Sequence, residues 1–396
     1  MTKVLITDGF EKEGIERLIG EGFHVVNEKF SPEELIKQIP QYDALIVRSA
    51  TKVTKEVIDE GAKGNLEIIG RSGVGTDNID VKYATEKGIV VKFAPSGATI
   101  SVAELTIGLM LDLSRKISMT NSALNKGFWK KENGGELFEK TLGIIGCGRI
   151  GKRVAYIAKH GFDMKVLGKD TVQDSESGID YTTLDELLSK SDYITLNIPK
   201  LKEPVITLKE LSSMKKTAYL IDVSRGGNVD EAALYTSLKN GGIAGAAKDV
   251  FVKEGSKFEE EYSTNKNPLI ELDNFIGTPH LGASTREGQL RTGMEMANVI
   301  INYLKNGDFG NTVNLGQKRE NEDITKYKVS IHHEDIPGMF GQIGSIFGKY
   351  NINILNQPTE PLKNGKIITH YLVEKPVSDD ILNEIKALNG VYRVKK

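Results

Sequence analysis

The sequence predicts an α/β protein built from two doubly wound domains, one of them discontinuous, and a small third domain at the C-terminus. Short apolar runs alternate with helical patterns along most of the chain, which is typical of a parallel sheet with helices on both faces. A glycine-rich turn joins a strand to a helix near the middle, and residues 327–396 follow a βαββαβ pattern. The 396 residues exceed the size of one ordinary core, so two or three domains are expected.

The first doubly wound domain is expected to take up residues 1–97. A capping box, formed by Ser31 and Glu34, marks the start of one of its helices. Its strands are predicted at 4–7, 24–26, 44–47, 68–70 and 90–91, and its helices at 11–21, from 31, at 53–60 and at 81–87.

The second doubly wound domain is expected at 98–285. A helix at 101–116 carries the chain into it, and a long helix at 284–306 returns the chain, so that 286–316 completes the first domain. Residues 317–326 are polar and charged and are expected to form a linker. Six parallel strands are predicted at 142–145, 164–167, 193–198, 218–223, 243–247 and 274–278, with helices at 153–160, 184–190, 209–215 and 231–239.

The glycine-rich turn has the spacing GxGxxG, with Gly146, Gly148 and Gly151 placed directly after a strand. The first glycine permits a tight turn, the second lets backbone amides approach a pyrophosphate, and the third lets the helix pack closely on the strand. The unpaired N–H groups and positive dipole end of that helix would then face the phosphates.

The strand that follows this helix ends near Asp170, about twenty residues after the last glycine, which is where an acceptor for a ribose 2′-hydroxyl is expected. Strand, glycines, helix, strand and acid in this order favour a dinucleotide site over an ordinary turn between a strand and a helix.

Two loops of the first domain follow strand ends, where ligands collect in open α/β sheets. Arg48 and Ser49 in one loop form a plausible anion clamp, although a solvated surface arginine is an equal alternative. Gly73 and Gly75 in the other leave backbone amides uncovered, which suits a carboxylate or phosphate, and they could equally be ordinary turn glycines.

Three strand ends of the second domain supply Arg225, Glu254 and His280. These are the groups needed to move hydride between a hydroxy acid and a nicotinamide. A guanidinium binds the substrate carboxylate in a set orientation, and a histidine that titrates near neutrality accepts the hydroxyl proton. A carboxylate holds the imidazole tautomer. A structural histidine and a surface glutamate are the alternatives.

The composition and charge of the chain argue against some classes of binding partner. A formal net charge of −2 gives no electrostatic reason to expect nucleic acid, and no apolar run approaches the length needed to span a bilayer. The first ten residues read as a strand rather than a secretion signal. One cysteine, Cys147, cannot form an internal disulfide, which fits a cytoplasmic protein, and it is interpreted as a small residue that fits the glycine turn.

With these residues in view, the chain resembles the D-isomer-specific 2-hydroxyacid dehydrogenases over nearly its whole length. The resemblance implies two Rossmann-like domains, of which 1–97 with 286–316 binds substrate in a flavodoxin-like fold and 98–285 binds NAD. It rests on Val47-Arg48-Ser49, Gly73-Val74-Gly75, Asp77-Asn78-Ile79-Asp80, Ser101-Val102-Ala103-Glu104, the glycine turn, Ser224-Arg225-Gly226-Gly227, Asp249-Val250-Phe251 and Pro279-His280-Leu281-Gly282-Ala283-Ser284-Thr285.

The resemblance implies catalysis by Arg225, Glu254 and His280 and no metal. Arg48 and Ser49 would bind a substrate phosphate, together with a substrate contact at Gly73, Val74, Gly75, Arg225 and His280. The implied NAD contacts are Val74, Gly146, Gly148, Arg149, Ile150, Gly151, Asp170, Val223, Ser224, Asp249, Gly282 and Ala283.

The C-terminal unit resembles an ACT domain, a module that binds amino acids at a dimer interface. It implies an effector site at His333, Asp335 and Asn353, with serine as the candidate, and a homodimer or homotetramer. The chain departs from the family pattern at Lys248, where an apolar residue is usual, and at Gly255, where proline is usual.

The members that the chain resembles most oxidise 3-phospho-D-glycerate to 3-phosphooxypyruvate with NAD, the first step of phosphorylated serine biosynthesis. A relative that acts on an unphosphorylated acid, such as a glyoxylate or hydroxypyruvate reductase, is the alternative enzyme. A dinucleotide-sensing corepressor is the alternative from another class, and the terminal βαββαβ unit argues against it.

Overall fold

The computed structural model describes residues 1–254, 267–306, 311–314, 327–357, 359–361 and 365–395. The chain divides into two compact units, residues 1–315 and residues 316–396. The predicted linker at 317–326 lies outside the described residues. No helix of the described residues is long and apolar enough to cross a membrane.

The first sheet is parallel and has the strand order β2-β1-β3-β4-β5, the flavodoxin-like order. Its strands are β1 (Lys3–Ile6), β2 (His24–Asn27), β3 (Ala44–Val47), β4 (Ile68–Arg71) and β5 (Val90–Phe93). Its helices are α1 (Lys12–Gly20), α2 (Pro32–Gln38), α3 (Lys55–Lys63) and α4 (Val81–Glu86), with a 3₁₀ turn, η1 (Ile39–Gln41), after α2. The capping box of Ser31 and Glu34 is present at the start of α2.

The second sheet is also parallel, with the order β12-β11-β10-β9-β6-β7-β8. Its order reverses between β6 and β9, so the ligand crevice is expected at the carboxyl ends of these two strands. The strands are β6 (Thr141–Ile145), β7 (Lys165–Lys169), β8 (Asp180–Tyr181), β9 (Tyr193–Leu196), β10 (Tyr219–Asp222), β11 (Gly245–Lys248) and β12 (Phe275–Gly277).

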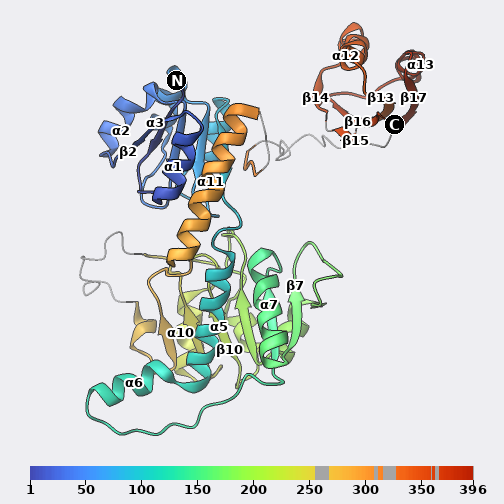
Figure 1. Ribbon diagram of the computed structural model, residues 1–396. Coiled ribbons are helices and arrows are strands. Elements are labelled where there is room, and N and C mark those ends of the chain that lie inside the picture. The colour runs from blue at the N-terminus through green and yellow to red at the C-terminus, as the bar shows by residue number, and fades with distance from the viewer. Residues whose placement is uncertain (255–266, 307–310, 315–326, 358, 362–364, 396) are drawn as a thin grey trace. The chain divides into compact units, whose positions relative to one another are not determined.

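The helices that belong to the second sheet start from α5 (Thr99–Arg115), whose apolar residues join the core of β6, β7 and α7. Figure 1 shows α5 beside β10 and α7 beside β7. The others are α6 (Ile117–Asn125), α7 (Arg149–Phe162), α8 (Leu184–Lys190), α9 (Leu208–Ser212) and α10 (Glu231–Lys239), with a 3₁₀ turn, η2 (Pro268–Glu271).

The long helix α11 (Arg286–Asn306) returns to the first sheet. Met296 and Ile300 on α11 are fully buried in the core that Val4, Ile46 and Ile68 form, and α11 runs beside α1 in Figure 1. This packing is what a discontinuous first domain requires, because the helix covers a sheet that lies about two hundred residues earlier in the chain.

Two predictions of local structure were wrong, and one helix was not predicted. The helix after the glycine turn begins at Arg149 rather than at residue 153, because Gly148 caps it directly. The second sheet has seven strands rather than six, since the two-residue β8 pairs with β7. A separate helix, α6, follows α5, and Lys116 with φ +55° breaks the chain between them.

The second unit has the predicted βαββαβ order with one additional strand, β15. Its antiparallel sheet runs β14-β16-β13-β17, and β15 also pairs with β16. Tyr371 and Phe347 are fully buried in its core. The elements are β13 (Lys328–Glu334), α12 (Met339–Lys349), β14 (Ile354–Asn356), β15 (Thr359–Pro361), β16 (Lys366–Val373), α13 (Asp379–Lys386) and β17 (Val391–Lys395). The ferredoxin-like fold is confirmed.

Candidate active site

His280 and Glu254 form a pair at the carboxyl ends of β11 and β12. Nδ1 of His280 lies 2.9 Å from Oε2 of Glu254, and both side chains are partly open to solvent. The other carboxylate oxygen, Oε1, accepts a hydrogen bond of 3.1 Å from the backbone N–H of Phe251. Since the carboxylate accepts from Nδ1, the hydrogen bond favours the tautomer in which Nε2 is free to take a proton.

The contact between His280 and Glu254 shifts the pKa of both groups. The hydrogen bond to Glu254 raises the pKa of His280, although burial and the charge of Arg225 act in the opposite direction. Burial raises the pKa of Glu254, but the hydrogen bond and charge of His280 outweigh it, so that the net pKa is lowered. The glutamate therefore stays ionised, while the imidazole keeps its proton to a higher pH than an ordinary histidine.

Asp249 holds the loop on which His280 stands. Its buried carboxylate accepts hydrogen bonds from Thr278 Oγ1 at 2.6 Å, from Leu281 N at 2.7 Å and from Gly282 N at 2.8 Å. Burial raises the pKa of Asp249, and these three hydrogen bonds work against that rise. The backbone of His280 takes a left-handed conformation, φ +55°, and its N–H donates to the carbonyl of Asp249. The loop is thus fixed in a conformation that most residues disfavour.

Arg225, which follows β10, reaches the loop after β4 in the first sheet. Its Nε donates to Asp77 Oδ2 at 3.3 Å, and its Nη1 donates to the carbonyl of Ser224 at 2.7 Å. A Cβ added to Gly75 would lie 2.2 Å from Nη2 of Arg225, so this glycine makes room for the guanidinium. Arg225, Glu254 and His280 follow β10, β11 and β12, which are neighbours in the second sheet, so all three lie at one edge of that sheet. The charge of Arg225 accordingly acts on the pKa of both His280 and Glu254.

Sequence reasoning missed Arg71, the last residue of β4. Its guanidinium lies against Gly73, where an added Cβ would be 1.6 Å from Nη1. Burial, and after it the charge of Arg225, lower the pKa of Arg71 to about 10, while Asp77 opposes both. Nη1 donates to the carbonyl of Ser72, but the buried Nε has no partner among the described residues. Its position at a strand end beside a glycine was the available signal.

The loop of Arg48 and Ser49 is held from two sides. Asp8 Oδ2 accepts from the N–H of Arg48 at 2.7 Å, and Asn78 Nδ2 donates to the carbonyl of Arg48 at 2.8 Å. The guanidinium of Arg48 lies 3.5 Å from Glu11, and its charge contributes to the pKa of Arg71. Ser49 is exposed. Arg48 follows β3 and Arg71 ends the neighbouring β4, so both lie at the edge of the first sheet where Arg225 pairs with Asp77.

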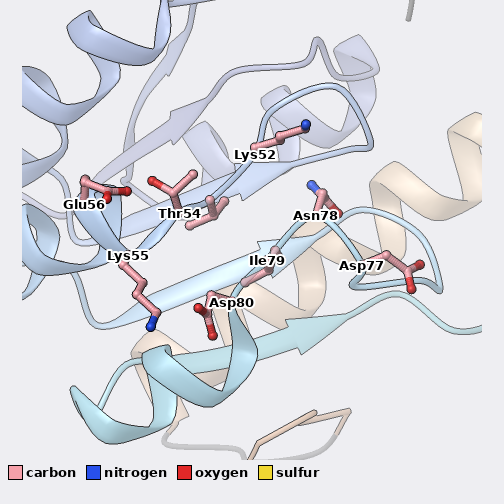
Figure 2. Close-up of a pocket in the computed structure, with 9 residues that line it drawn as sticks. Lys52, Thr54, Lys55, Glu56, Asp77, Asn78, Ile79 and Asp80 are labelled. Atoms are coloured by element: carbon pink, nitrogen blue, oxygen red, sulfur yellow. The ribbon is translucent and has the colours of Figure 1, made fainter. Parts of the chain in front are cut away.

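A recess beside this site is lined by residues 52–56 and 77–80 (Figure 2). Asp77 forms one end of it and also pairs with Arg225, so the recess adjoins the arginines. Lys55 and Asp80 lie together at its other end in Figure 2. Since the recess carries three carboxylates, Glu56, Asp77 and Asp80, against two ammonium groups, Lys52 and Lys55, it offers a dianion less than the arginines do.

The glycine turn fits a dinucleotide. Gly146 has φ +92°, and an added Cβ would lie 2.6 Å from Ile198 Cγ2; on Gly151 it would lie 2.2 Å from the carbonyl oxygen of Gly146. Gly148 has no heavy atom within 4 Å of its added Cβ, so the face over the start of α7 is open. The first and third glycines are needed for packing, and the second leaves room for phosphate oxygens at the N-terminus of α7.

Asp170 does more than the sequence suggested. Its Oδ2 accepts from the N–H of Cys147 at 2.6 Å, and Oδ1 accepts from Val172 N at 3.1 Å. Burial raises the pKa of Asp170, but the backbone donors outweigh it and lower the net value. The ionised carboxylate thus fixes the glycine turn from the end of β7, and its remaining lone pairs can accept a ribose hydroxyl.

The other predicted cofactor residues occupy the same edge of the second sheet or face it. Arg149 and Ile150 are the first residues of α7, Val223 and Ser224 are buried after β10, and Gly282 is bonded to Asp249. Ala283 is exposed, as is the side chain of Val74 in the loop after β4.

The predicted effector residues of the second unit differ in access. His333 is fully buried, and its ring nitrogens are bonded to the carbonyl of Glu334 at 2.8 Å and to Thr369 Oγ1 at 2.9 Å. Asp335 and Asn353 are exposed. Asp335 and Asn353 are therefore accessible to an effector. His333 could bind one only after it gives up a hydrogen bond to Glu334 or Thr369. Across the described ranges, no group of three or more His, Cys, Asp or Glu could hold a metal ion.

Comparison with known proteins gives the family. The family model for the NAD-binding domain of D-isomer specific 2-hydroxyacid dehydrogenases matches residues 107–282, from α5 to the loop of His280. A D-3-phosphoglycerate dehydrogenase of Bacillus subtilis is 34% identical over 405 residues, which cover 98% of this chain and 73% of the relative. The chain belongs to the D-isomer specific 2-hydroxyacid dehydrogenases.

Within these dehydrogenases, the chain is 43% identical to a D-3-phosphoglycerate dehydrogenase of Methanocaldococcus jannaschii over 80% of its own length. It is 40% identical to a hydroxypyruvate reductase of Thermotoga maritima, over 76% of this chain and 98% of the relative. The chain spans only 60%, 59% and 54% of the D-3-phosphoglycerate dehydrogenases of M. jannaschii, Archaeoglobus fulgidus and Synechocystis.

Solved structures of other 2-hydroxyacid dehydrogenases share the fold. A D-lactate dehydrogenase of Aquifex aeolicus, complexed with NAD and lactic acid, matches with a TM-score of 0.67 and 33% identity over 78% of this chain and 99% of that one. An NAD⁺-bound 3-phosphoglycerate dehydrogenase of Entamoeba histolytica matches with a TM-score of 0.65 and 28% identity over 79% and 98%. NAD is the cofactor of the family, and the glycine turn and Asp170 of this chain fit it.

Proposed function

We propose that the chain oxidises 3-phospho-D-glycerate to 3-phosphooxypyruvate with NAD, the first step of phosphorylated serine biosynthesis. The observation that carries this proposal is the placement of Arg48 and Arg71 at neighbouring strand ends of the first sheet, where Arg225 pairs with Asp77, together with the His280–Glu254 pair. The substrate bears a carboxylate and a phosphate, so it needs more than one guanidinium. A substrate with a carboxylate alone would leave two of these cations unused.

Each residue of the site has a role in substrate binding or proton transfer that follows from its chemistry. Arg225 binds the substrate carboxylate, since a guanidinium can hold it through two parallel hydrogen bonds. Nε2 of His280 accepts the proton of the 2-hydroxyl, and Glu254 stabilises the imidazolium through Nδ1. NAD, when bound, accepts the hydride that leaves C2. Arg71 and Arg48 bind the phosphate, with Ser49 as a further donor.

The names of the relatives support the same substrate. The relatives from M. jannaschii and B. subtilis are D-3-phosphoglycerate dehydrogenases. A second candidate, reduction of hydroxypyruvate, is favoured by the relative from T. maritima, of which this chain covers 98%. The two candidates differ in the phosphate, which makes the arginine cluster the feature to test.

Formation of NADH by the purified protein, compared for 3-phosphoglycerate, D-glycerate and D-lactate, tests the proposal. A kcat/KM that is highest for 3-phosphoglycerate is the expected result. A higher value for D-glycerate, or for hydroxypyruvate in the reverse direction than for its phosphorylated analogue, would favour the second candidate.

Further parts of the proposal concern the domains and partners. We assign 1–97 with 286–316 as the substrate-binding part, 98–285 as the NAD-binding part and 327–396 as an ACT-type regulatory part. Serine is the proposed effector of that part, at a site with Asp335 and Asn353, in a homodimer or homotetramer in the cytoplasm. Addition of serine to the NADH assay, with and without residues 327–396, tests the regulatory role.

A further inference from the structure

Lys248 and Asp222 form an ion pair with no solvent exposure at the ends of two neighbouring strands. Lys248 Nζ lies 2.6 Å from Asp222 Oδ2, and both side chains are 0% exposed. Asp222 is the last residue of β10 and Lys248 the last of β11, and the two are direct partners in the parallel register.

Asp222 connects the ion pair to the loop of Arg225 through hydrogen bonds to Ser224. Oδ1 of Asp222 accepts from Ser224 Oγ at 2.6 Å and from Ser224 N at 3.1 Å. Ser224 Oγ accepts in turn from Asn228 Nδ2 at 3.1 Å, and the carbonyl of Ser224 accepts from Arg225 Nη1 at 2.7 Å. The carboxylate that neutralises Lys248 therefore also fixes the residue against which the guanidinium of Arg225 rests.

Lys248 connects the ion pair to the segments that carry His280 and Glu254. The carbonyl of Lys248 accepts from Thr278 N at 2.9 Å, two residues before His280. The ammonium lies 6.0 Å from the ring centroid of Phe251, whose N–H donates to Glu254. Through Asp222, Thr278 and Phe251, Lys248 is thus connected to the segments that carry Arg225, His280 and Glu254. Its own side chain stays buried and does not reach the site.

Stability alone is a weak reason for such a pair. Two charges lose their hydration on burial, and apolar side chains of similar volume commonly stabilise a core at least as well. Unlike an apolar pair, an ion pair fixes the orientation of its side chains, because the carboxylate of Asp222 must point at both the ammonium of Lys248 and Ser224. Fixed orientation of reacting groups is worth large factors in rate.

We propose that the Lys248–Asp222 ion pair is a positioning device that sets the Ser224–Arg225 loop relative to His280 for binding of the acid substrate. The inference rests on the proposed function of the site, in which Arg225 binds the substrate carboxylate. It assigns to Lys248 a role in acid binding that is separate from the binding of NAD at the glycine turn.

The test uses the full chain and two variants. Lys248→Met removes the charge but keeps the length of the side chain, so Asp222 loses its counter-charge and the Ser224 loop shifts. The Kd of 3-phosphoglycerate, by calorimetry, and its KM should rise roughly 10- to 100-fold, while the Kd of NAD rises by a clearly smaller factor, because the glycine turn is unaffected and only the contact at Ser224 moves. In Asp222→Asn/Lys248→Met, no charge is left and the amide can still accept from Ser224, so acid binding should recover to within a few-fold of wild type.

Three results would overturn the proposal: a Lys248→Met protein that loses thermal stability but keeps its kinetic constants, an equal loss of acid and NAD binding, or a double variant as impaired as the single one. If Lys248→Met does not fold, Asp222→Asn replaces it, with the same expected loss of acid binding. A wild-type protein that binds D-glycerate more tightly than 3-phosphoglycerate would contradict the proposed substrate alone, and the variants would then be compared with D-glycerate.

Discussion

The imidazole of His280 and the carboxylate of Glu254 meet at 2.9 Å, although 26 residues separate them in the sequence. The contact joins the loops after β11 and β12 and leaves Nε2 as the nitrogen that can exchange a proton with a substrate. Because Glu254 also accepts from the backbone of Phe251, its carboxylate is held in place before any substrate arrives.

The pH dependence of turnover should report this contact. Glu254 raises the pKa of His280, so the neutral imidazole that accepts the hydroxyl proton appears only at a pH above that of an ordinary histidine. In the oxidation direction, kcat/KM should rise with pH through that pKa, and in the reduction direction it should fall. Glu254→Gln should move both midpoints to lower pH and reduce kcat roughly 10- to 100-fold. An unmoved midpoint in the Glu254→Gln profile would separate the glutamate from the titrating group.

Arg71 should decide between phosphorylated and unphosphorylated acids. Arg71→Met removes a buried donor of charge-assisted hydrogen bonds, so kcat/KM for 3-phosphoglycerate should fall about 10- to 100-fold, with a smaller change for D-glycerate. Thermal stability should stay equal or increase, since burial and the charge of Arg225 both oppose the charged form of Arg71. Arg17→Met, at an arginine of α1 that pairs with Glu21, is the matched control and should leave substrate preference unchanged. Equal losses on both acids would place Arg71 outside the phosphate site.

The third glycine of the turn should tolerate no methyl group. Gly151→Ala would bring a Cβ to 2.2 Å from the carbonyl of Gly146, so strand and helix would have to separate at a cost of about 1–3 kcal/mol. Affinity for NAD should fall with stability, as measured by fluorescence titration and thermal unfolding. Gly161→Ala in the same helix has no atom within 4 Å of the added Cβ and is the control, with stability unchanged or slightly higher. The same loss in both variants would mean that close packing at Gly151 is not the cause.

Asp170 should affect the cofactor and leave the chemistry intact. Asp170→Ala removes the acceptor that fixes the N–H of Cys147, so the Kd of NAD should rise, while kcat at saturating NAD stays near wild type. Asp174→Ala, at a nearby exposed carboxylate that pairs with Lys152, should change neither quantity. A drop in kcat at saturating NAD would tie Asp170 to the catalytic step.

The sequence was informative wherever a local rule determined the structure. Alternation of strands and helices predicted both parallel sheets. The spacing of Gly146, Gly148 and Gly151 predicted the turn, because the first and third glycines are required by local packing and the second keeps the helix N-terminus open. Helix α6 was missed because its break from α5 is the left-handed Lys116, a conformation that no glycine or proline marks in the sequence.

Contacts between distant segments could not be predicted in the same way. That Gly75 makes room for the guanidinium of Arg225 depends on how the two sheets face each other. The pairing of Lys248 with Asp222 likewise follows from strand register. Periodicity places residues on a face of an element, whereas register and domain contacts decide which side chains meet.

The account depends on His280 as the proton acceptor, and one comparison tests it most directly. NADH formation from 3-phosphoglycerate is measured for wild type and His280→Gln, with the Kd of NAD determined on the same samples. We expect the rate to fall about 10²- to 10⁴-fold while the Kd of NAD stays unchanged. A variant that keeps its turnover, or that loses NAD binding together with turnover, would contradict the account.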